Sequence, residues 1–575
     1  MNHPLLDIQN LTVEFNTEDS TVCAIDSISF SIEAGKTVAL VGESGSGKSV
    51  SALSILKLIP SPPSIIKSGK ILFTTKQHKQ IDLVTIDNES LQHIRGNEIG
   101  IIFQEPMTSL NPLMKCGKQV AESIMKHKQC TYEIAREKTI KLFEDVKLPN
   151  PSEIMERYPH ELSGGQKQRV MIAMAICCEP NLLIADEPTT ALDVTVQKVI
   201  LDLLKELQHK YGMAILFITH DLNLVKNFAD KVAVLYKSKL VEQNIANELF
   251  SNPTHPYTKG LLACRPDPTK RVHLLKTVSE ILNETESTIH SKNEVDGNQI
   301  DSIHFRNRII EIQQSIPILQ FEHLNVWYPT KHNFFGKVTA WYKAVNNVNL
   351  LIHQGETMGL VGESGCGKTT IGKAIVKLTP ISSGAILYKG KDIALFNNSD
   401  LAEYRKKVQI IFQDPYSSLN PRVSIGNAIK EPMDVHGLHS SNERKEKAIE
   451  LLTKVDLKPE HYNRYPHEFS GGQRQRICIA RALALQPEFI ICDESVSALD
   501  VSVQAQVLNL LVHLREEFNL SYLFISHDLG VIKHISDHIA VMNKGNIVEL
   551  NNSEELYKNP QEDYTKKLIS SSFDF

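Results

Sequence analysis

Apolar residues follow two different patterns along the chain, and each pattern predicts a different kind of strand. The segments LDIQNLTVEF (6–15) and CAIDSISFSI (23–32) alternate apolar and polar residues, as strands with one buried face do. The segments VALVG (38–42), LLIAD (182–186) and AILFITH (214–220) are short continuous apolar runs, as in parallel strands that are buried on both faces. A helical stretch joins the last two runs, so we expect a right-handed strand–helix–strand crossover there.

A glycine-rich sequence follows the first continuous run, and a second copy lies in the other half of the chain. GESGSGKS (42–49) and GESGCGKT (362–369) both fit the phosphate-loop pattern G-x-x-x-x-G-K-[ST]. Such a loop leads into a helix and presents backbone N–H groups and the helix dipole to an anion. The residues predicted to bind phosphates are Gly42, Glu43, Ser44, Gly45, Ser46, Gly47, Lys48 and Ser49, and Gly362, Glu363, Ser364, Gly365, Cys366, Gly367, Lys368 and Thr369. Among them, we expect the two lysines to reach the β and γ oxygens and the hydroxyls of Ser49 and Thr369 to hold Mg²⁺.

Further motifs follow each phosphate loop, in the same order in both halves. They are a glutamine in IIFQEP or IIFQDP (Gln104, Gln413), the segment LSGGQ or FSGGQ (162–166, 469–473), an Asp-Glu pair (Asp186 and Glu187, Asp493 and Glu494), the segment ALD (Asp193, Asp500), and a histidine after an apolar strand (His220, His527). From LSGGQ onward the offset between the copies is constant, since 470 − 163 and 527 − 220 both equal 307. A constant offset over that span predicts a duplicated domain.

The chain divides into two large domains and a central segment that matches neither. With 575 residues it is too long for one domain. We predict the first domain at 1–264, a linker at 265–315 and the second domain at 316–575. The linker sequence is polar and poor in aromatic residues, which predicts partial disorder, with a short helix at 309–316.

Composition and charge exclude several classes of protein. The formal net charge is −5 and the pI is about 6.5, so we expect no nucleic-acid partner, because nucleic-acid-binding domains are usually basic. No apolar run approaches the ~18 residues of a membrane span, and the N-terminus has no secretory signal, so we expect a soluble, cytoplasmic protein. The nine cysteines include no C-x-x-C pair, which favours free thiols over a metal site.

The acidic pairs and the histidines follow apolar strands, which places them at the edge where α/β sheets bind ligands. We expect Asp186 and Asp493 to hold Mg²⁺, directly or through water. A single histidine after a strand would more often be a packed core residue. Recurrence of His220 and His527 at the same offset in both halves favours a role in the site instead.

Together these motifs resemble those of ABC-type ATP-binding domains, and LSGGQ is far more specific to that family than the phosphate loop. The resemblance covers nearly the whole chain apart from the central segment. It implies an α/β fold with two tandem P-loop ATPase domains, each with a parallel-sheet core, an antiparallel β subdomain and a helical subdomain that carries the signature. It also implies ATP and Mg²⁺ as cofactors.

The resemblance further implies roles for individual residues. The glutamates Glu187 and Glu494 would polarise the attacking water as general bases. The histidines His220 and His527 would contact the γ-phosphate and the water. The glutamines Gln104 and Gln413 would sense Mg²⁺ and the water. The rings of Phe15 and Tyr328 stand where the family stacks an aromatic residue on adenine, although strand packing alone would also account for them.

In this family the signature completes the nucleotide site of the opposite domain, through its serine, its glycine amides and the helix that follows. Ser470 and Gly472 are thereby implied to complete the site of Lys48. Ser163 and Gly165 would complete the site of Lys368. Two halves would then meet head to tail, with two ATP molecules between them.

Five stretches narrow the resemblance to the ATPases of bacterial dipeptide and oligopeptide importers. They are EPMTSLNPL, DPYSSLNPR, RYPHELSGGQ, RYPHEFSGGQ and HPYTKGLL (255–262). Two ATPases that are often separate chains in that family are fused here, and residues 331–345 resemble a long loop of the second partner. Cys264 stands alone in LLACRPDP, so we expect no iron–sulfur cluster.

We therefore predict an ATP-hydrolysing subunit that energises a membrane permease for peptide import. Its partners would be integral membrane permease subunits and a solute-binding protein, at the cytoplasmic face of the bacterial plasma membrane. Leu110 and Leu419, in the SLNP stretches, would contact short cytoplasmic helices of the permease. Nickel or glutathione import is an alternative with the same ATPase pattern. A soluble tandem ABC protein acting on ribosomes or DNA is another, but it would favour a charged helical linker, basic patches or zinc-binding cysteine pairs.

Overall fold

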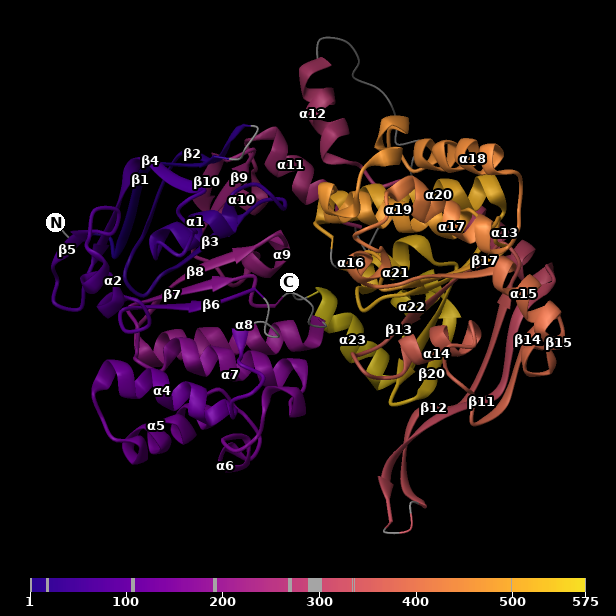
Figure 1. The fold of residues 1–575 in the computed structure, drawn as a ribbon, viewed down its shortest axis with the longest axis horizontal. Helices are drawn as coiled ribbons and strands as arrows, with labels where there is room; N and C mark the ends of the chain where they lie inside the picture. The colour runs from indigo at the N-terminus through magenta and orange to yellow at the C-terminus, as the bar shows by residue number, and fades with distance from the viewer. Residues whose placement is uncertain are drawn as a thin grey trace.

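The structure is a computed structural model of the chain. It describes residues 3–16, 20–104, 109–189, 194–266, 271–287, 302–333, 335, 337–497 and 499–573. Two α/β halves lie side by side, the N-terminal half on the left of Figure 1 and the C-terminal half on the right.

A six-stranded sheet with the order β10-β9-β3-β8-β7-β6 forms the core of the first half. Its strands are β3 (Thr37–Val41), β6 (Ile99–Ile102), β7 (Leu182–Asp186), β8 (Ala214–Thr219), β9 (Lys231–Tyr236) and β10 (Lys239–Ile245). All neighbours are parallel except β10, which is antiparallel to β9 at the edge. Every residue of β3, β7 and β8 is buried, which explains the continuous apolar runs of these strands.

Helices of the first half surround this sheet and form a separate layer beneath it in Figure 1. The helices next to the sheets are α1 (Lys48–Ile55), α2 (Asn88–Ile94), α8 (Val194–Tyr211), α9 (Leu222–Lys226), α10 (Ala246–Ser251) and α11 (Pro256–Ala263). The helical subdomain consists of α4 (Cys116–Lys128), α5 (Tyr132–Asp145), α6 (Pro151–Ile154) and α7 (Gly164–Ile176). As predicted, the segment between Gln104 and the signature is rich in helix, since it contains α4, α5 and α6.

A four-stranded sheet completes the first half and has the order β2-β1-β4-β5. Its strands are β1 (Leu6–Asn16), β2 (Thr21–Ile32), β4 (Ser64–Thr74) and β5 (Gln80–Asp82). All its pairs are antiparallel, and the apolar face of β1 and β2 is buried, as the alternating sequences predict.

The second half repeats this architecture, which confirms the duplicated α/β fold. Its core sheet has the order β16-β17-β18-β13-β19-β20, and its antiparallel sheet has the order β12-β11-β14-β15. The strands are β11 (Pro317–His332), β12 (Val338–His353), β13 (Thr357–Val361), β14 (Ser383–Tyr388), β15 (Lys391–Asp392), β16 (Val408–Ile411), β17 (Phe489–Asp493), β18 (Ser521–Ile525), β19 (His538–Asn543) and β20 (Asn546–Asn552). The helices are α14 (Lys368–Ile375), α15 (Asn398–Lys407), α16 (Pro415–Ser418), α17 (Ile425–Val435), α18 (Ser441–Lys454), α19 (Gly471–Leu483), α20 (Val501–Phe518), α21 (Leu529–Ile535), α22 (Ser553–Lys558) and α23 (Asp563–Phe573).

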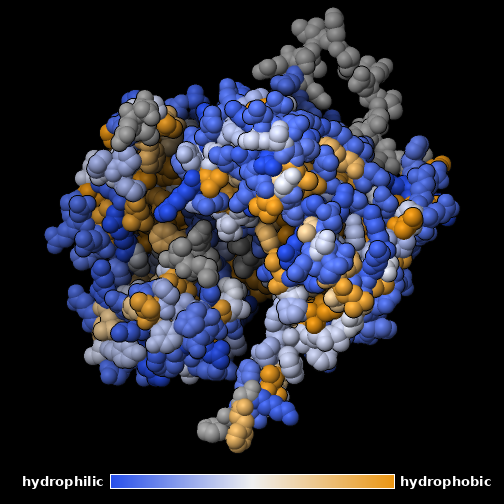
Figure 2. Space-filling view, turned by 45° about the vertical axis from the view of Figure 1, so that its right-hand side comes forward, coloured by the Kyte–Doolittle hydropathy of each residue, from blue (hydrophilic) through white to orange (hydrophobic). Residues whose placement is uncertain are grey.

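The strands β11 and β12 form a hairpin that is much longer than its counterpart in the first half. It projects from the body of the second half as an arm in Figures 1 and 2. This hairpin contains residues 331–345, which the sequence compares with a long loop. At its tip, Phe335 is 90% exposed.

The central segment is more ordered than its polar sequence predicts. It contains α12 (Val278–Ser287), which packs on α11, and α13 (Ser302–Gln314), which begins seven residues before the predicted helix (309 − 302 = 7). Residues 288–301 lie outside the described part of the chain. The division of the chain at residues 264 and 315 stays a prediction.

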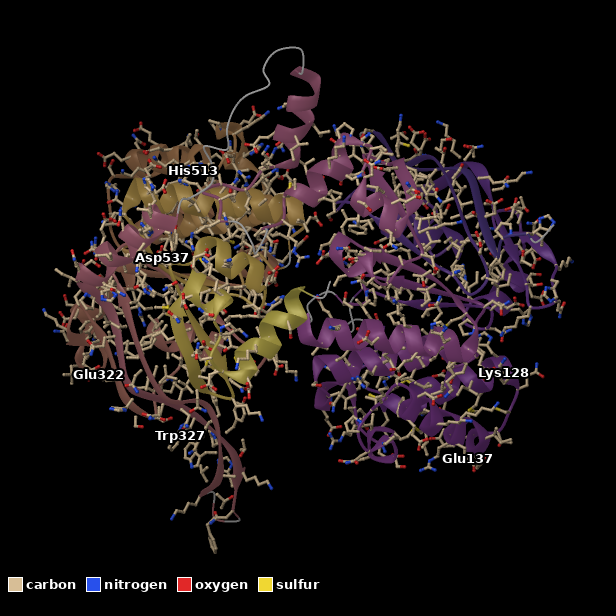
Figure 3. All side chains as sticks on the ribbon, turned by 180° about the vertical axis from the view of Figure 1, so that it is seen from behind. Lys128, Glu137, Glu322, Trp327, His513 and Asp537 are labelled. Atoms are coloured by element: carbon tan, nitrogen blue, oxygen red, sulfur yellow. The ribbon has the colours of Figure 1, made fainter. Side chains whose placement is uncertain are left out.

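Polar contacts hold α13 and the residues around Arg271 on the second half. Arg308 on α13 donates from Nε and Nη2 to the two oxygens of Asp537, at 2.7 and 3.0 Å. The guanidinium of Arg271 lies over the ring of Phe305, 3.8 Å from its centroid, and donates to the hydroxyl of Ser553. Asp537 is fully buried inside the second half, where Figure 3 labels it. These residues are ordered because polar side chains that look solvated in sequence have buried partners in the fold, while the prediction of partial disorder stays untested for the rest of the segment.

The two halves also meet through apolar side chains. One buried cluster includes Leu249, Leu261 and Val278 from the N-terminal side and Leu508, Val531 and Leu568 from the second half. Helix α23 contacts α8 of the first half. Within the described residues, no helix combines the length and the apolar character that crossing a membrane requires.

Candidate functional site

Each phosphate loop folds between a buried strand and a helix, so its conformation is set by tight packing. The loop of the first half joins β3 to α1, and Gly47 adopts φ +102° just before Lys48. A Cβ atom on Gly47 would lie 2.4 Å from the carbonyl oxygen of Ala24. In the second half, a Cβ atom on Gly367 would lie 2.1 Å from the oxygen of Ala344. Only glycine fits these two positions, because a side chain there would collide with the backbone of the neighbouring strand.

The lysine of each loop is buried and points back over its own loop. Lys48 Nζ donates to the carbonyls of Gly42 and Glu43 at 2.7 and 2.9 Å. Lys368 Nζ makes the equivalent bonds at 2.7 and 3.0 Å. Burial lowers the pKa of Lys48, and the nearby carboxylate of Glu187 opposes this effect.

The first loop fits a polyphosphate ligand by an unsatisfied polar group as well as by its shape. The hydroxyl of Ser46 is buried and has no hydrogen-bond partner among the described residues. Because an unsatisfied buried hydroxyl is costly, a phosphate oxygen is a suitable partner for it. Cys366 takes this position in the second half, and its Sγ lies 3.9 Å from Lys368 Nζ.

The predicted Mg²⁺ ligands meet in pairs. The Ser49 hydroxyl donates to Asp186 Oδ1 at 3.0 Å, and the Thr369 hydroxyl donates to Asp493 Oδ1 at 2.9 Å. Burial raises the pKa of Asp186 to about 6. In the part of the chain that the structure describes, no three His, Cys, Asp or Glu side chains gather as a metal site. A hydroxyl and one carboxylate suit Mg²⁺, which typically takes few protein ligands and completes its shell with phosphate oxygens and water.

The structure brings the predicted glutamine, glutamate and histidine together in the first half. Gln104 Nε2 donates to Glu187 Oε2 at 3.1 Å, and His220 Nδ1 lies 3.2 Å from the same oxygen. Burial acts to lower the pKa of His220, but the contact with the Glu187 carboxylate outweighs burial and raises that pKa.

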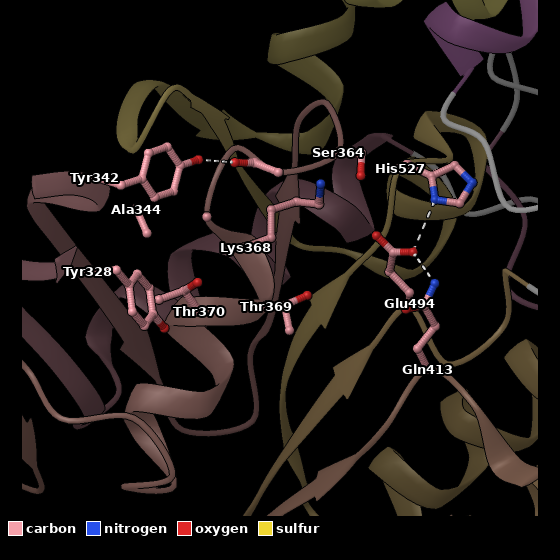
Figure 4. A pocket seen from close by; sticks show the side chains of 12 residues that line it. Tyr328, Tyr342, Ala344, Ser364, Lys368, Thr369, Thr370, Gln413, Glu494 and His527 are labelled. Atoms are coloured by element: carbon pink, nitrogen blue, oxygen red, sulfur yellow. Dashed lines mark hydrogen bonds and ion pairs between the residues drawn. The ribbon is translucent and has the colours of Figure 1, made fainter. Parts of the chain in front are cut away.

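The second half repeats this arrangement. Gln413 Nε2 donates to Glu494 Oε2 at 2.9 Å, and His527 Nδ1 lies 3.5 Å from that oxygen (Figure 4). The pKa of His527 is likewise raised, since its contact with Glu494 outweighs burial. Both halves therefore present one carboxylate with a donor on either side, beside a phosphate loop.

Both glutamates have an uncommon backbone conformation that the sequence pattern does not predict. Glu187 has φ +47° and Glu494 has φ +48°, in the left-handed region. The amide of Glu187 donates to Ile218 O at 2.9 Å, and the amide of Glu494 donates to Ile525 O at 3.0 Å. These bonds to the neighbouring strand hold each glutamate across the end of the sheet. Such strained residues cost about 1–3 kcal/mol and cluster at functional sites.

Two tyrosines that belong to none of the nucleotide-site motifs contact the phosphate loops. Tyr257 on α11 accepts a hydrogen bond from the amide of Glu43 at 3.1 Å, and its ring stacks on Tyr236 with a centroid distance of 4.1 Å. Tyr564 on α23 accepts an equivalent bond from the amide of Glu363 at 3.1 Å. A signal was present in the sequence, because both tyrosines begin the tripeptide YTK and stand 307 positions apart (564 − 257 = 307).

The predicted base-stacking residues lie on equivalent strands. Tyr328 on β11 lines a pocket of about 300 Å³ that continues to Lys368, Thr369 and Glu494 (Figure 4). Phe15 on β1 is half-buried and packs against the apolar cluster beneath that sheet. The position of Tyr328 fits base stacking, whereas that of Phe15 fits both the packing and the stacking interpretation.

The signature residues begin helices α7 and α19. Ser163 accepts a hydrogen bond from the amide of Gln166, and Ser470 accepts one from the amide of Gln473. Both serines are exposed. Every residue that lines the 300 Å³ pocket at Lys368 comes from the second half, so the signature of the first half does not border that pocket in this structure.

Polar contacts cross from the second half to the phosphate loop of the first. The amide of Ser44 donates to Asp500 Oδ2 at 2.9 Å, and the Ser502 hydroxyl bonds to Glu43. Asp500 belongs to the ALD segment, and its counterpart Asp193 lies outside the described residues. The segment of the second half that follows Asp493 and Glu494 therefore contacts the phosphate loop of the first half.

The predicted surface role of Leu110 and Leu419 was wrong. Leu110 is 2% exposed and Leu419 is 3% exposed, each within an apolar cluster of its helical subdomain. A charged residue there would be buried without a partner and would disrupt the subdomain. Near the same stretches, Leu113 is 85% exposed and Tyr416 is 64% exposed. The hydropathy of SLNP does not reveal which of its apolar neighbours point outward.

Comparison with known proteins gives relatives that match almost the whole chain. The glutathione import ATP-binding protein GsiA of Pectobacterium atrosepticum is 43% identical over 568 residues, which cover 99% of this chain and 89% of that protein. GsiA of Escherichia coli K12 is 43% identical over 575 residues, with the same coverage. The dimeric post-hydrolysis structure of the ATP-binding cassette MJ0796 bound to ADP and Pi is 27% identical and covers 41% of this chain and 98% of its own, with a TM-score of 0.37.

Two family models match the chain. The ABC transporter model matches residues 25–190 and 345–497, which include both phosphate loops and both acidic pairs. The model for the C-terminal region of oligopeptide/dipeptide transporters matches residues 241–291, which include Tyr257 and α12. The chain therefore belongs to the ABC transporter family, as an ATP-binding protein of the oligopeptide/dipeptide type with two ABC domains that couple ATP hydrolysis to transport.

Proposed function

We propose that this chain energises a membrane permease that imports glutathione. The observation that carries this proposal is the 43% identity to glutathione import proteins over 99% of the chain. Glutathione is a tripeptide, so this substrate is compatible with the oligopeptide/dipeptide match at 241–291. It is the alternative named from the sequence, and the relatives favour it over a general peptide substrate. An action on ribosomes or DNA has no comparable support.

The proposed partners are integral membrane permease subunits and a solute-binding protein, with the chain bound at the cytoplasmic face of the plasma membrane. Solute contacts would then lie in those partners and not in this chain. Substrate identity must therefore be tested by transport in cells.

Deletion of the gene should abolish most uptake of radiolabelled glutathione, because no ATP-driven closure would then power the permease. Expression of the wild-type chain should restore uptake, whereas a Lys48→Ala, Lys368→Ala variant should not. Excess unlabelled glutathione should compete, and dialanine or Ni²⁺ should not. Unchanged glutathione uptake in the deletion strain, together with lost dipeptide or nickel uptake, would reassign the substrate.

The proposed reaction is hydrolysis of MgATP at both phosphate loops. The Glu187 and Glu494 carboxylates would accept a proton from the attacking water, since each is fixed between a glutamine and a histidine. His220 and His527 would donate toward the γ-phosphate, and Gln104 and Gln413 would hold the water and Mg²⁺ in place. Mg²⁺, held at Ser49 and Asp186 or at Thr369 and Asp493, would neutralise charge on the phosphates.

A Glu187→Gln, Glu494→Gln double variant should retain ATP binding while turnover falls by at least ~10², because an amide cannot accept the proton of the water. Binding and hydrolysis are measured by calorimetry and phosphate release. Glu33→Gln serves as the control, since this surface glutamate pairs with Lys231 and should leave both measurements unchanged. Near-normal turnover in the double variant would remove the glutamates from the mechanism.

ATP-driven closure would complete each site with the signature of the opposite half. The Ser44–Asp500 contact supports this arrangement, because it brings the second half against the first phosphate loop. Closure would carry Ser470 and Gly472 to the site of Lys48, and Ser163 and Gly165 to the site of Lys368. The N-terminus of α7 or α19 would then face the γ-phosphate with its dipole and free amides.

The variant pair Lys48→Ala, Ser470→Arg should damage one shared site and keep about the activity of the worse single variant. The pair Lys48→Ala, Ser163→Arg should damage both sites and lose nearly all activity, since residues of one catalytic unit are non-additive. Photolabelling with an azido-ATP and peptide mapping would report each site separately. If Ser470→Arg impairs labelling at Lys368 and spares Lys48, each half completes its own site.

A groove of about 620 Å³ in the second half is a suitable receptor for a cytoplasmic helix of the permease. It lies between β16 and helices α17 and α19, and its lining includes Phe412, Cys478 and Arg481. Gln413 and Asp493 line the same groove, so a helix bound there would be close to the nucleotide site. Tyr416, beside this groove, is exposed and packs on the Arg474 guanidinium, 3.7 Å from its ring centroid.

Substitution of Leu113 and Tyr416 by Asp should abolish uptake by cells and leave the ATPase of the isolated chain within about twofold, because exposed positions tolerate charge. Leu395→Asp is the matched control, since Leu395 is 82% exposed but lies in the antiparallel subdomain. Normal uptake by the Leu113, Tyr416 double variant would exclude this surface from docking.

A further inference from the structure

The two nucleotide sites differ at the residue opposite the base-stacking position. In the second half, Tyr328 on β11 pairs directly with Tyr342 on β12. In the first half, Phe15 on β1 pairs directly with Val22 on β2. Side chains of directly paired residues lie on the same face of a sheet, about 5 Å apart. The second half therefore presents two aromatic rings where the first presents one.

Both rings of the second half border the nucleotide pocket. Tyr328 and Tyr342 lie on either side of Ala344 at one end of the pocket, and Gln413, Glu494 and His527 lie at the other end (Figure 4). Lys368 and Thr369 lie between these two groups. Tyr328 is 39% exposed and Tyr342 is 52% exposed, so each has ring surface available to a ligand. Along the pocket, the lining residues therefore follow the order of the parts of a nucleotide, from the base to the γ-phosphate.

Tyr342 is also attached to the phosphate loop. Its hydroxyl donates to the carbonyl oxygen of Gly365 at 2.9 Å. Gly365 has φ +78° and no atom within 4 Å of the position of a Cβ, so the surrounding protein leaves this part of the loop unpacked. The hydrogen bond fixes the direction of the Tyr342 ring and links the base end of the pocket to the phosphate end.

The first half has the same backbone arrangement around its phosphate loop but lacks an aromatic ring equivalent to that of Tyr342. Gly47 approaches the carbonyl of Ala24 in the same way that Gly367 approaches that of Ala344. Val22 stands two residues before Ala24, as Tyr342 stands two residues before Ala344. Val22 has neither an aromatic face nor a hydroxyl group. The difference between the sites is therefore one of side chains and not of strand register.

We propose that Tyr342 is a second base-contacting residue and that the second half binds adenine nucleotide more tightly than the first. An aromatic ring contributes to base binding through stacking, which is worth about tenfold or more in affinity per base. Attachment of the ring to Gly365 reduces the ordering that binding requires. The second site retains nucleotide at concentrations that leave the first site free, so the two halves load in sequence.

The chain contains two tryptophans, and both lie on the strands that carry the two pocket tyrosines. Trp327 precedes Tyr328 on β11, and Trp341 precedes Tyr342 on β12. Trp327 lies on the hairpin arm (Figure 3), where Lys343 Nζ sits 4.8 Å from its ring centroid. Since the first half has no tryptophan, intrinsic fluorescence reports on the second site alone.

The test compares full-length variants titrated with a non-hydrolysable ATP analogue, by tryptophan fluorescence and by calorimetry. The wild-type chain should bind two molecules with different affinities, and the tighter one should produce the fluorescence change. Tyr342→Val, which copies the first half, should weaken the tighter site about tenfold. Tyr342→Phe, which keeps the ring and removes the hydroxyl, should weaken it less than threefold. Val22→Tyr should strengthen the weaker site.

Inorganic tripolyphosphate separates a base contact from a structural role. It occupies the phosphate loop but has no base, so its affinity for Tyr342→Val should match that for the wild-type chain. A parallel loss of affinity for tripolyphosphate and the ATP analogue would make Tyr342 a support of the loop and overturn the proposal. Equal analogue affinities at the two sites of the wild-type chain, or unchanged calorimetric affinities in Tyr342→Val, would also overturn it.

Discussion

The backbone turn at Glu187 and Glu494 is the constraint on which the rest of each site depends. Each glutamate leaves a fully buried strand in the left-handed conformation, and its amide is bonded to the neighbouring strand. The preceding aspartate therefore stays with the phosphate-loop hydroxyl, while the glutamate side chain is directed to the glutamine and histidine. Two adjacent carboxylates thus serve two separate sets of partners. In a regular strand, successive residues would simply point to opposite faces of the sheet.

Burial of the sheet maintains that turn. Strands β7 and β8 in the first half, and β17 and β18 in the second, are buried at every residue. A densely packed core resists local relaxation, so a strained residue at its edge keeps its geometry. Tyr257 and Tyr564 restrain the phosphate loops instead, because each bonds to the amide of a phosphate-loop glutamate. The helices that carry these tyrosines thereby connect the periphery of each half with its loop.

The duplicated halves share their reactive groups but differ in their surroundings. Asp230 and Asp537 are equivalent, yet Asp230 pairs with the exposed Lys36, whereas Asp537 is buried against Arg308 of α13. An exposed pair contributes roughly 0–1 kcal/mol, while loss of one partner from a buried pair costs about 3–5 kcal/mol. The contacts of Arg271 with Ser553 and of Leu275 with Asn509 also have no counterpart in the first half, where Ala246 and Asp202 stand. Arg271, Leu275 and α13 of the central segment are thus attached to the second half.

The sequence alone determined the chemistry and the duplication, because these depend on residue types at fixed spacing. Continuous apolar runs identified the parallel strands, and glycine spacing identified the loops, since burial and close backbone approach leave few other choices. Tertiary structure decided what depends on neighbours distant in the chain. The placement of Arg271 and of α13 rests on partners more than 200 positions away, and the role of Tyr257 rests on a loop 214 positions earlier. The burial of Leu110 and Leu419 was equally invisible, because hydropathy states that a side chain prefers an apolar contact and does not state whether the core or another protein supplies it.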